Sequence, residues 1–183
     1  MKGIVFSEFI EMVEQRFSPE VADRMIEAAK VPSGGAYTAV GTYSHEEMLA
    51  LIAELARLTG GSVDELVQAY GRHLFTRFTQ LYPGFFEGVT SAFDFLQRIE
   101  DHVHLEVRKL YPDAELPRFD TVQRDAHHLV MVYESRRPFA ALAQGLIDGC
   151  LEHWGEAADV RTTDLSEPGI TRVRFDIVRR SAA

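Results

Sequence analysis

Residues 90–110 read TSAFDFLQRIEDHVHLEVRKL, and the rest of the chain is organised around this stretch. Its apolar residues recur at intervals of three and four, so a helix turning about 100° per residue places them on one buried face. These residues are Ala92, Leu96, Ile99, Val103, Val107 and Leu110. His102 and His104 lie on opposite flanks of that face. The spacing therefore predicts a helix but does not tell which histidine points into the core.

A second stretch, residues 128–139, reads HLVMVYESRRPF and predicts a strand. The strand period of two places five of its residues on one side. In order they are Leu129, Met131, Tyr133, Ser135 and Arg137. A phenol, a hydroxyl and a guanidinium thus follow two apolar residues on one face. Such donors bind carboxylates, which a guanidinium grips with two parallel hydrogen bonds.

Together the two stretches resemble the haem nitric oxide and oxygen binding (H-NOX) family, relatives of the haem domain of soluble guanylate cyclase. The resemblance rests on Val103-His104-Leu105 and Tyr133-x-Ser135-x-Arg137, and it runs from MKGIVF through YGRHLFTRF and LYPGFF to Arg-Val-Arg-Phe-Asp near the end. It implies that His104 is the iron ligand of haem b and that Tyr133, Ser135 and Arg137 hold the propionates. Ferrous haem needs a neutral imidazole and partners for its anionic propionates.

The resemblance implies further cofactor-binding residues, all of them apolar: Val5, Phe9, Leu74, Phe78, Pro117 and Leu142. In the family, a proline at the place of Pro117 presses on the haem. Oxygen-binding members carry a tyrosine five residues after the motif arginine, where this chain has Leu142. Phe9 and Leu74 stand where that pattern has an indole and an amide. Because bound dioxygen gains from a hydrogen-bond donor, we expect the protein to bind nitric oxide and carbon monoxide but not oxygen.

The resemblance also implies a signalling role. Family members that stand alone in bacteria regulate a histidine kinase or a diguanylate cyclase, and we expect such a partner in trans. Nitric oxide weakens the bond trans to it, so loss of His104 from the iron would free the helix over 90–110. The sequence contains no kinase, cyclase or receiver pattern, and we therefore expect a sensor rather than an enzyme.

Two other classes of function remain open. In a haem-free module, Tyr133, Ser135 and Arg137 would grip a carboxylated small molecule or a peptide. A peroxidase-like haem enzyme is less favoured, because Phe9, Leu74 and Leu142 provide no acid or base. His73, beside Leu74, is the residue that could supply one.

Capping signals and hydrophobic periods predict the class α+β, in one domain over residues 1–183. Helices are expected over about 2–17, from 19, over 44–58, 62–81, 90–110 and 138–154, and strands over about 118–124, 129–135, 158–165 and 170–178. The starting signals are Ser18 before Pro19, Ser44 with Glu47, and Ser62 with Glu65. The mainly helical N-terminal two-thirds would precede a roughly four-stranded antiparallel sheet with an inserted helix, and the haem would be buried between them.

Composition narrows the partners and the compartment. The formal net charge of −9 disfavours nucleic acid and anionic membranes. No apolar run approaches the length of a membrane span or signal peptide. The only cysteine, Cys150, cannot form an internal disulfide, which favours a cytoplasmic protein. Cys150 with His153 cannot supply the four ligands of a zinc site, and adjacent His127 and His128 would point to opposite faces of a strand.

Overall fold

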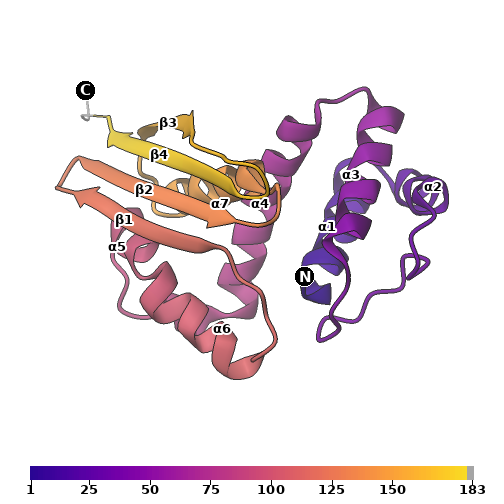
Figure 1. The fold of residues 1–183 in the computed structure, drawn as a ribbon, viewed down its shortest axis with the longest axis horizontal. Coiled ribbons are helices and arrows are strands. Elements are labelled where there is room, and N and C mark those ends of the chain that lie inside the picture. Colours follow the sequence, from indigo (N-terminus) through magenta and orange to yellow (C-terminus); the bar gives the residue numbers. More distant parts are fainter. Residues whose placement is uncertain (181–183) are drawn as a thin grey trace.

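The computed structural model describes residues 1–180, and Figure 1 shows a helical half and a sheet-bearing half that are joined by α4. The elements are α1 (Gly3–Arg16), α2 (Pro19–Ala29), α3 (His45–Thr59), α4 (Val63–Leu81), η1 (Pro83–Phe86), α5 (Ala92–Gln97), η2 (Ile99–Val103), α6 (His104–Leu110), β1 (Arg118–Arg124), β2 (His128–Ser135), α7 (Ala140–His153), β3 (Ala158–Asp164) and β4 (Thr171–Arg179). The predicted α+β class is confirmed. Within residues 1–180, no helix is both long and apolar enough to cross a membrane.

The four strands form an antiparallel sheet in the order β1-β2-β4-β3. Tyr133 of β2 lies opposite Phe119 of β1 and Val173 of β4. The period-two prediction is confirmed for Leu129, Met131 and Tyr133, which are buried in one cluster with residues of α7, whereas Arg137 lies beyond the end of the strand. One face of the sheet is thus core, and α7 lies alongside the sheet (Figure 1).

Side-chain caps start the helices at the predicted serines. Ser18 accepts a hydrogen bond from the backbone of Val21, and Ser62 accepts one from Glu65. Ser44 caps α3 as well, through the backbone N–H of Glu46, but among the described residues neither Glu47 nor Glu65 makes the reciprocal bond of a capping box. The Glu47 carboxylate instead accepts hydrogen bonds from the hydroxyl groups of Ser33, at 2.6 Å, and Tyr37, at 3.0 Å. It ties the loop after α2 to α3.

The stretch over 90–110 is not the single uniform helix that was predicted. A π-helical turn, η2, separates α5 from α6. One extra residue in a turn shifts the register of everything after it by about 100° around the axis, which brings His104 onto the face that Ile99, Val103 and Val107 also present to the cavity. Leu110, expected to be buried, is 62% exposed, whereas His104 is buried and His102 is exposed. The π turn therefore decides the question that the spacing left open.

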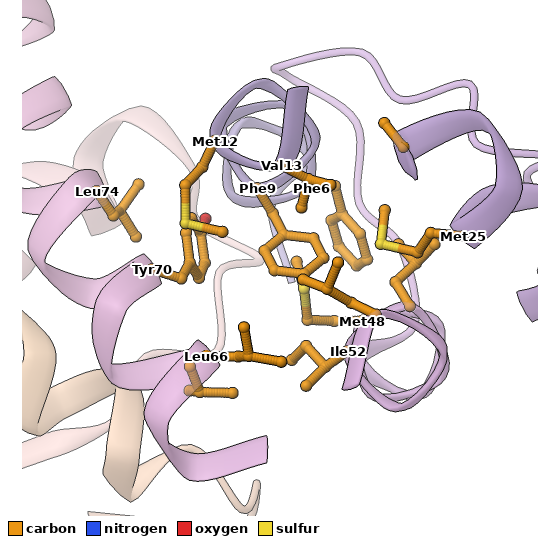
Figure 2. Packing of buried hydrophobic residues seen from close by; sticks show 14 of the residues in the cluster. Phe6, Phe9, Met12, Val13, Met25, Met48, Ile52, Leu66, Tyr70 and Leu74 are labelled. Atoms are coloured by element: carbon orange, nitrogen blue, oxygen red, sulfur yellow. The ribbon is translucent and has the colours of Figure 1, made fainter. Parts of the chain in front are cut away.

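Two hydrophobic cores meet at α4. The first joins α1, α2 and α3 to one face of α4, and Figure 2 shows Phe9 between Met48 and Tyr70. The second joins α5, α7 and the sheet to the opposite face. Leu74 belongs to the first core and Phe75 to the second. Consecutive residues of one helix thereby connect both halves of the molecule.

Candidate functional site

A cavity of about 700 Å³ lies between the two halves, within the usual size range of a small-molecule site. Its wall is built from α1, α4, η1, α5, η2, α6, the segment before β1 with the start of that strand, the end of β2 and α7, together with residues 1–2 and 42–45. Aromatic residues are prominent in it: Tyr43, Phe75, Phe78, Tyr82, Phe85, Phe86, Phe95, Tyr111, Phe119, Tyr133 and Phe139. Phe86 and Phe95 stack with ring centroids 4.8 Å apart. The cavity suits a large, flat and mostly apolar ligand.

His104 lies in the cavity wall where α6 begins. Its Nδ1 is 2.5 Å from Oε1 of Glu100. Burial lowers the pKa of His104 below its ordinary value, although the hydrogen bond to Glu100 opposes that shift. The imidazole is therefore neutral near pH 7, as a metal ligand must be. With Nδ1 engaged by the carboxylate, Nε2 is the nitrogen left to bind a ligand.

Tyr133, Ser135 and Arg137 line the same cavity. Burial raises the pKa of Tyr133, so its phenol keeps its proton and can donate. Ser135 accepts a hydrogen bond from the Arg137 backbone at 3.0 Å, which fixes the chain where it leaves β2. The Arg137 guanidinium binds the carboxylate of Glu115, which is 81% exposed. Arg137 thus already holds a carboxylate at the cavity, and a ligand carboxylate could replace that of Glu115.

The structure brings nearly all of the sequence-predicted residues together. The cavity wall includes Val5, Leu74, Phe78, His104, Pro117, Tyr133, Ser135, Arg137 and Leu142. Phe9 is absent from this wall. Its ring is fully buried and packs edge-on against Tyr70, with the ring centroids 5.1 Å apart (Figure 2). The Tyr70 hydroxyl donates to the carbonyl oxygen of Val5. Phe9 therefore lies behind the cavity wall, where it packs on Tyr70.

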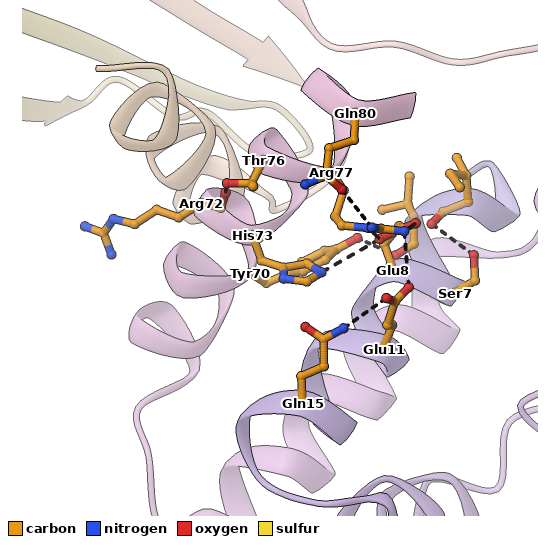
Figure 3. Close-up of polar contacts among 12 residues, drawn as sticks. Ser7, Glu8, Glu11, Gln15, Tyr70, Arg72, His73, Thr76, Arg77 and Gln80 are labelled. Atoms are coloured by element: carbon orange, nitrogen blue, oxygen red, sulfur yellow. Dashed lines mark hydrogen bonds and ion pairs between the residues drawn. The ribbon is translucent and has the colours of Figure 1, made fainter. Parts of the chain in front are cut away.

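His73 does not line the cavity. It faces Glu8 across the contact between α1 and α4, with Nε2 3.7 Å from the carboxylate (Figure 3). Glu8 is only 4% exposed and accepts a hydrogen bond from Arg77 at 2.6 Å. The acid/base group that a peroxidase-like enzyme would need is therefore not supplied by His73.

The other histidine and cysteine candidates are also placed away from the cavity. Cys150 is buried in the second core, and burial raises the pKa of its thiol well above the ordinary value. His153 packs on Trp154, and His128 lies 3.3 Å from Asp176. Among residues 1–180, no three His, Cys, Asp or Glu side chains are grouped so as to hold a metal ion. Single-histidine ligation of a haem iron needs no such group.

Sequence reasoning missed several residues at this site, and two of them bear directly on its chemistry. Glu100 is four residues before His104, and a carboxylate at that helical spacing is the signal that could have revealed it. Met1 is the other, because it lines the cavity and its ammonium group donates to the carbonyl of Tyr43 at 2.8 Å. Burial, and then the charge of Arg137, lower the pKa of this ammonium group. No feature of the sequence placed the first residue beside the 137th.

The helical half and the four-stranded antiparallel half enclose one cavity, which has a buried histidine in its wall and carboxylate-binding donors at the end of β2. This arrangement defines a class of small-molecule-binding domain whose cavity suits a flat, carboxylated ligand. Residues 2–162 match the haem-NO-binding family, and the chain belongs to it. The resemblance to H-NOX proteins is thereby confirmed. Members of this family are haem-based gas-sensing domains that bind gaseous ligands and regulate partners.

Solved structures agree with this assignment. The Fe(II) unliganded H-NOX protein from K. algicida is 38% identical, with a TM-score of 0.92 over 100% of this chain and 98% of that one. A mutant of the T. tengcongensis H-NOX protein is 23% identical, with a TM-score of 0.88 over 100% of both chains. An oxygen-binding H-NOX domain related to soluble guanylate cyclases is 23% identical, with a TM-score of 0.84 over 99% of this chain and 96% of that one. The last two show the fold alone. No curated protein sequence matches the chain.

Proposed function

We propose that this protein is a haem-based sensor of nitric oxide and carbon monoxide that excludes oxygen and regulates a separate signalling enzyme. One observation carries the gas selectivity: every side chain that α1, α4 and α7 present to the cavity is apolar. They are Ile4, Val5, Leu74, Phe75, Phe78, Leu142, Ala143, Leu146 and Ile147. These three helices offer bound dioxygen no side-chain hydrogen-bond donor, whereas nitric oxide and carbon monoxide bind ferrous iron without one.

The residues present fit haem. Ferrous haem, when bound, supplies the iron to which a diatomic gas attaches. His104 would bind that iron through Nε2, because Nδ1 is engaged by Glu100. Arg137, Ser135 and Tyr133 would hold the propionates by charge-assisted and neutral hydrogen bonds. Pro117 lies in the same wall and would contact the ring.

Non-covalent haem b is the form of the cofactor that we propose for residues 1–183, acting as one haem-binding domain. The chain has one cysteine, so the paired thioether links of a c-type haem cannot form. That cysteine, Cys150, is buried with its sulfur 3.8 Å from the carbonyl oxygen of Ala92. The cofactor would therefore be held by His104, the β2 motif and apolar packing.

A conformational change of α6 would transmit the gas-binding signal to the partner. His104 is the first residue of that helix, so breaking its bond to iron when nitric oxide binds would release the helix from the cavity. A released helix can signal only if a partner binds the two states with different affinity. From the resemblance of the chain, the partner is a histidine kinase or a diguanylate cyclase in the cytoplasm, and this chain acts on it without catalysis.

Absorption spectra test this proposal. The purified protein is reduced without air and then exposed separately to air, carbon monoxide and nitric oxide. We expect a five-coordinate ferrous spectrum that is unchanged by oxygen and is shifted by both other gases. A persistent oxygen complex in air would overturn the gas selectivity. Failure to take up haem after reconstitution would instead favour a haem-free module that binds a carboxylated ligand at Arg137.

A further inference from the structure

The π turn η2 ends directly at His104. The backbone N–H of His104 bonds the carbonyl of Ile99, five residues back, and Val103 bonds that of Arg98 in the same way, at 3.2 Å. π turns are rare and cost regular helical hydrogen bonding, and they are frequent at functional sites. Here the turn buries the ring of His104 in the cavity wall.

The carboxylate of Glu100 has two hydrogen-bond donors. Its Oε1 lies 2.5 Å from His104 Nδ1, and the same oxygen accepts the backbone N–H of Phe119 at 3.3 Å. Phe119 lies near the start of β1 and lines the cavity, and its ring centroid is 6.0 Å from that of His104. The Glu100 carboxylate is therefore bonded both to a side chain of α6 and to the backbone of β1, and the Glu100 side chain is only 27% exposed.

We infer that Glu100 is a positioning residue that presents His104 Nε2 to the iron and sets the strength of their bond, an inference that rests on the proposed function. An ionised carboxylate has no proton to donate, so in this contact Nδ1 carries the hydrogen and Nε2 keeps its lone pair. A carboxylate behind a ligating histidine fixes the ring orientation and makes it a stronger donor. Glu100 thereby opposes release of His104 when nitric oxide binds.

An ordinary ion pair within a helix would not account for the burial of His104 or for the bond from Phe119 to Glu100. Pairs four residues apart on an exposed helix contribute little and only to helix stability. Here the histidine is 9% exposed, and the acid also accepts from a strand that a helix pair would not involve. A purely structural pair predicts no change in the bond between His104 and iron when the acid is neutralised.

Resonance Raman spectra of the ferrous holoprotein separate these possibilities. We expect Glu100→Gln to lower the stretching frequency of the iron–histidine bond and to speed release of His104 under nitric oxide by about tenfold or more. Glu106→Gln is the matched control, because Glu106 lies on α6, the helix that begins at His104, and pairs with Lys109 at 2.6 Å rather than with His104. An unchanged frequency in Glu100→Gln would overturn the inference.

A second measurement needs no haem. Nitrogen-15 NMR of the apoprotein at alkaline pH should show His104 protonated at Nδ1 in the wild type, and a mixture of tautomers in Glu100→Leu. Protonation at Nε2 in the wild type would refute the role of Glu100, even if Glu100→Gln lost its haem. Failure of the proposed function gives a different pattern, because the wild type would then take up no haem whatever its tautomer.

Discussion

Gly145 of α7 and Gly71 of α4 touch backbone to backbone: a Cβ on Gly145 would lie 2.8 Å from the Gly71 Cα and 2.1 Å from the carbonyl oxygen of Gln68. Neither neighbour is a flexible side chain, so a methyl group there must separate the two helices. Since α4 carries residues of both cores, its contact with α7 fixes how the halves enclose the cavity.

Gly145→Ala should therefore destabilise the protein by about 1–3 kcal/mol, the usual cost of overpacking. Urea unfolding monitored by circular dichroism measures this loss. Gly84→Ala is the control, because a Cβ at Gly84 meets nothing within 4 Å and should leave the midpoint nearly unchanged. Equal midpoints for Gly145→Ala and the wild type would mean that the helices adjust without cost.

Arg137→Met should weaken haem binding. Removing a guanidinium that holds a carboxylate costs about 1.5–3 kcal/mol, or roughly tenfold to a hundredfold in affinity. The rate of haem transfer to an excess of apomyoglobin reports the change. Arg136→Met is matched, because Arg136 is adjacent but exposed and absent from the cavity wall. Equal transfer rates for the two variants would show that Arg137 does not hold a propionate.

Much of the fold could be predicted from local patterns. Caps at Ser18 and Ser62 and the alternation along β2 are consequences of neighbouring residues, and each is found where predicted. Tyr133 and Ser135 share a cavity because a strand alternates its faces, and Arg137 joins them from just beyond the end of β2, where its backbone N–H bonds Ser135.

The other features of the fold and the site depend on contacts between distant segments, which the spacing of residues in the sequence does not reveal. A helical period cannot foresee the π turn before His104, so it left His102 and His104 equivalent. Matching positions along α1 placed Phe9 at the site, but packing between α1 and α3 draws that ring into the first core. Close approach of Gly71 and Gly145 is likewise a property of two helices together.

Leu142→Tyr should give the protein affinity for oxygen. Leu142 lies in the cavity wall on α7, and a tyrosine there would add a hydroxyl donor to a wall whose side chains on α1, α4 and α7 are all apolar. Spectra of the ferrous variant in aerated buffer would then show a lasting oxygen complex. Leu142→Phe supplies the same ring without the hydroxyl and should remain insensitive to oxygen. If both variants respond alike, ring size rather than hydrogen bonding controls access.

His73 should make the stability of the protein depend on pH. Burial is the main cause that lowers its pKa below the ordinary 6.5, while Glu8 and Glu11 raise it and Arg77 lowers it. The folded protein therefore binds fewer protons at His73 than the unfolded chain does just below that value, so stability falls as pH drops through 6.5 toward the folded pKa. Within the described residues its Nε2 is buried without a hydrogen-bond partner, consistent with a neutral ring.

His73→Gln should flatten this fall, because glutamine does not titrate. Urea midpoints of the wild type and the variant, measured at pH values above and below 6.5, give the two slopes. His104 also has a lowered pKa and contributes in the same direction, so the informative quantity is the difference between the slopes. The control is His127→Gln at an exposed position, which should keep the wild-type slope. A His73→Gln slope as steep as that of the wild type would assign the pH dependence to His104 and to groups other than His73.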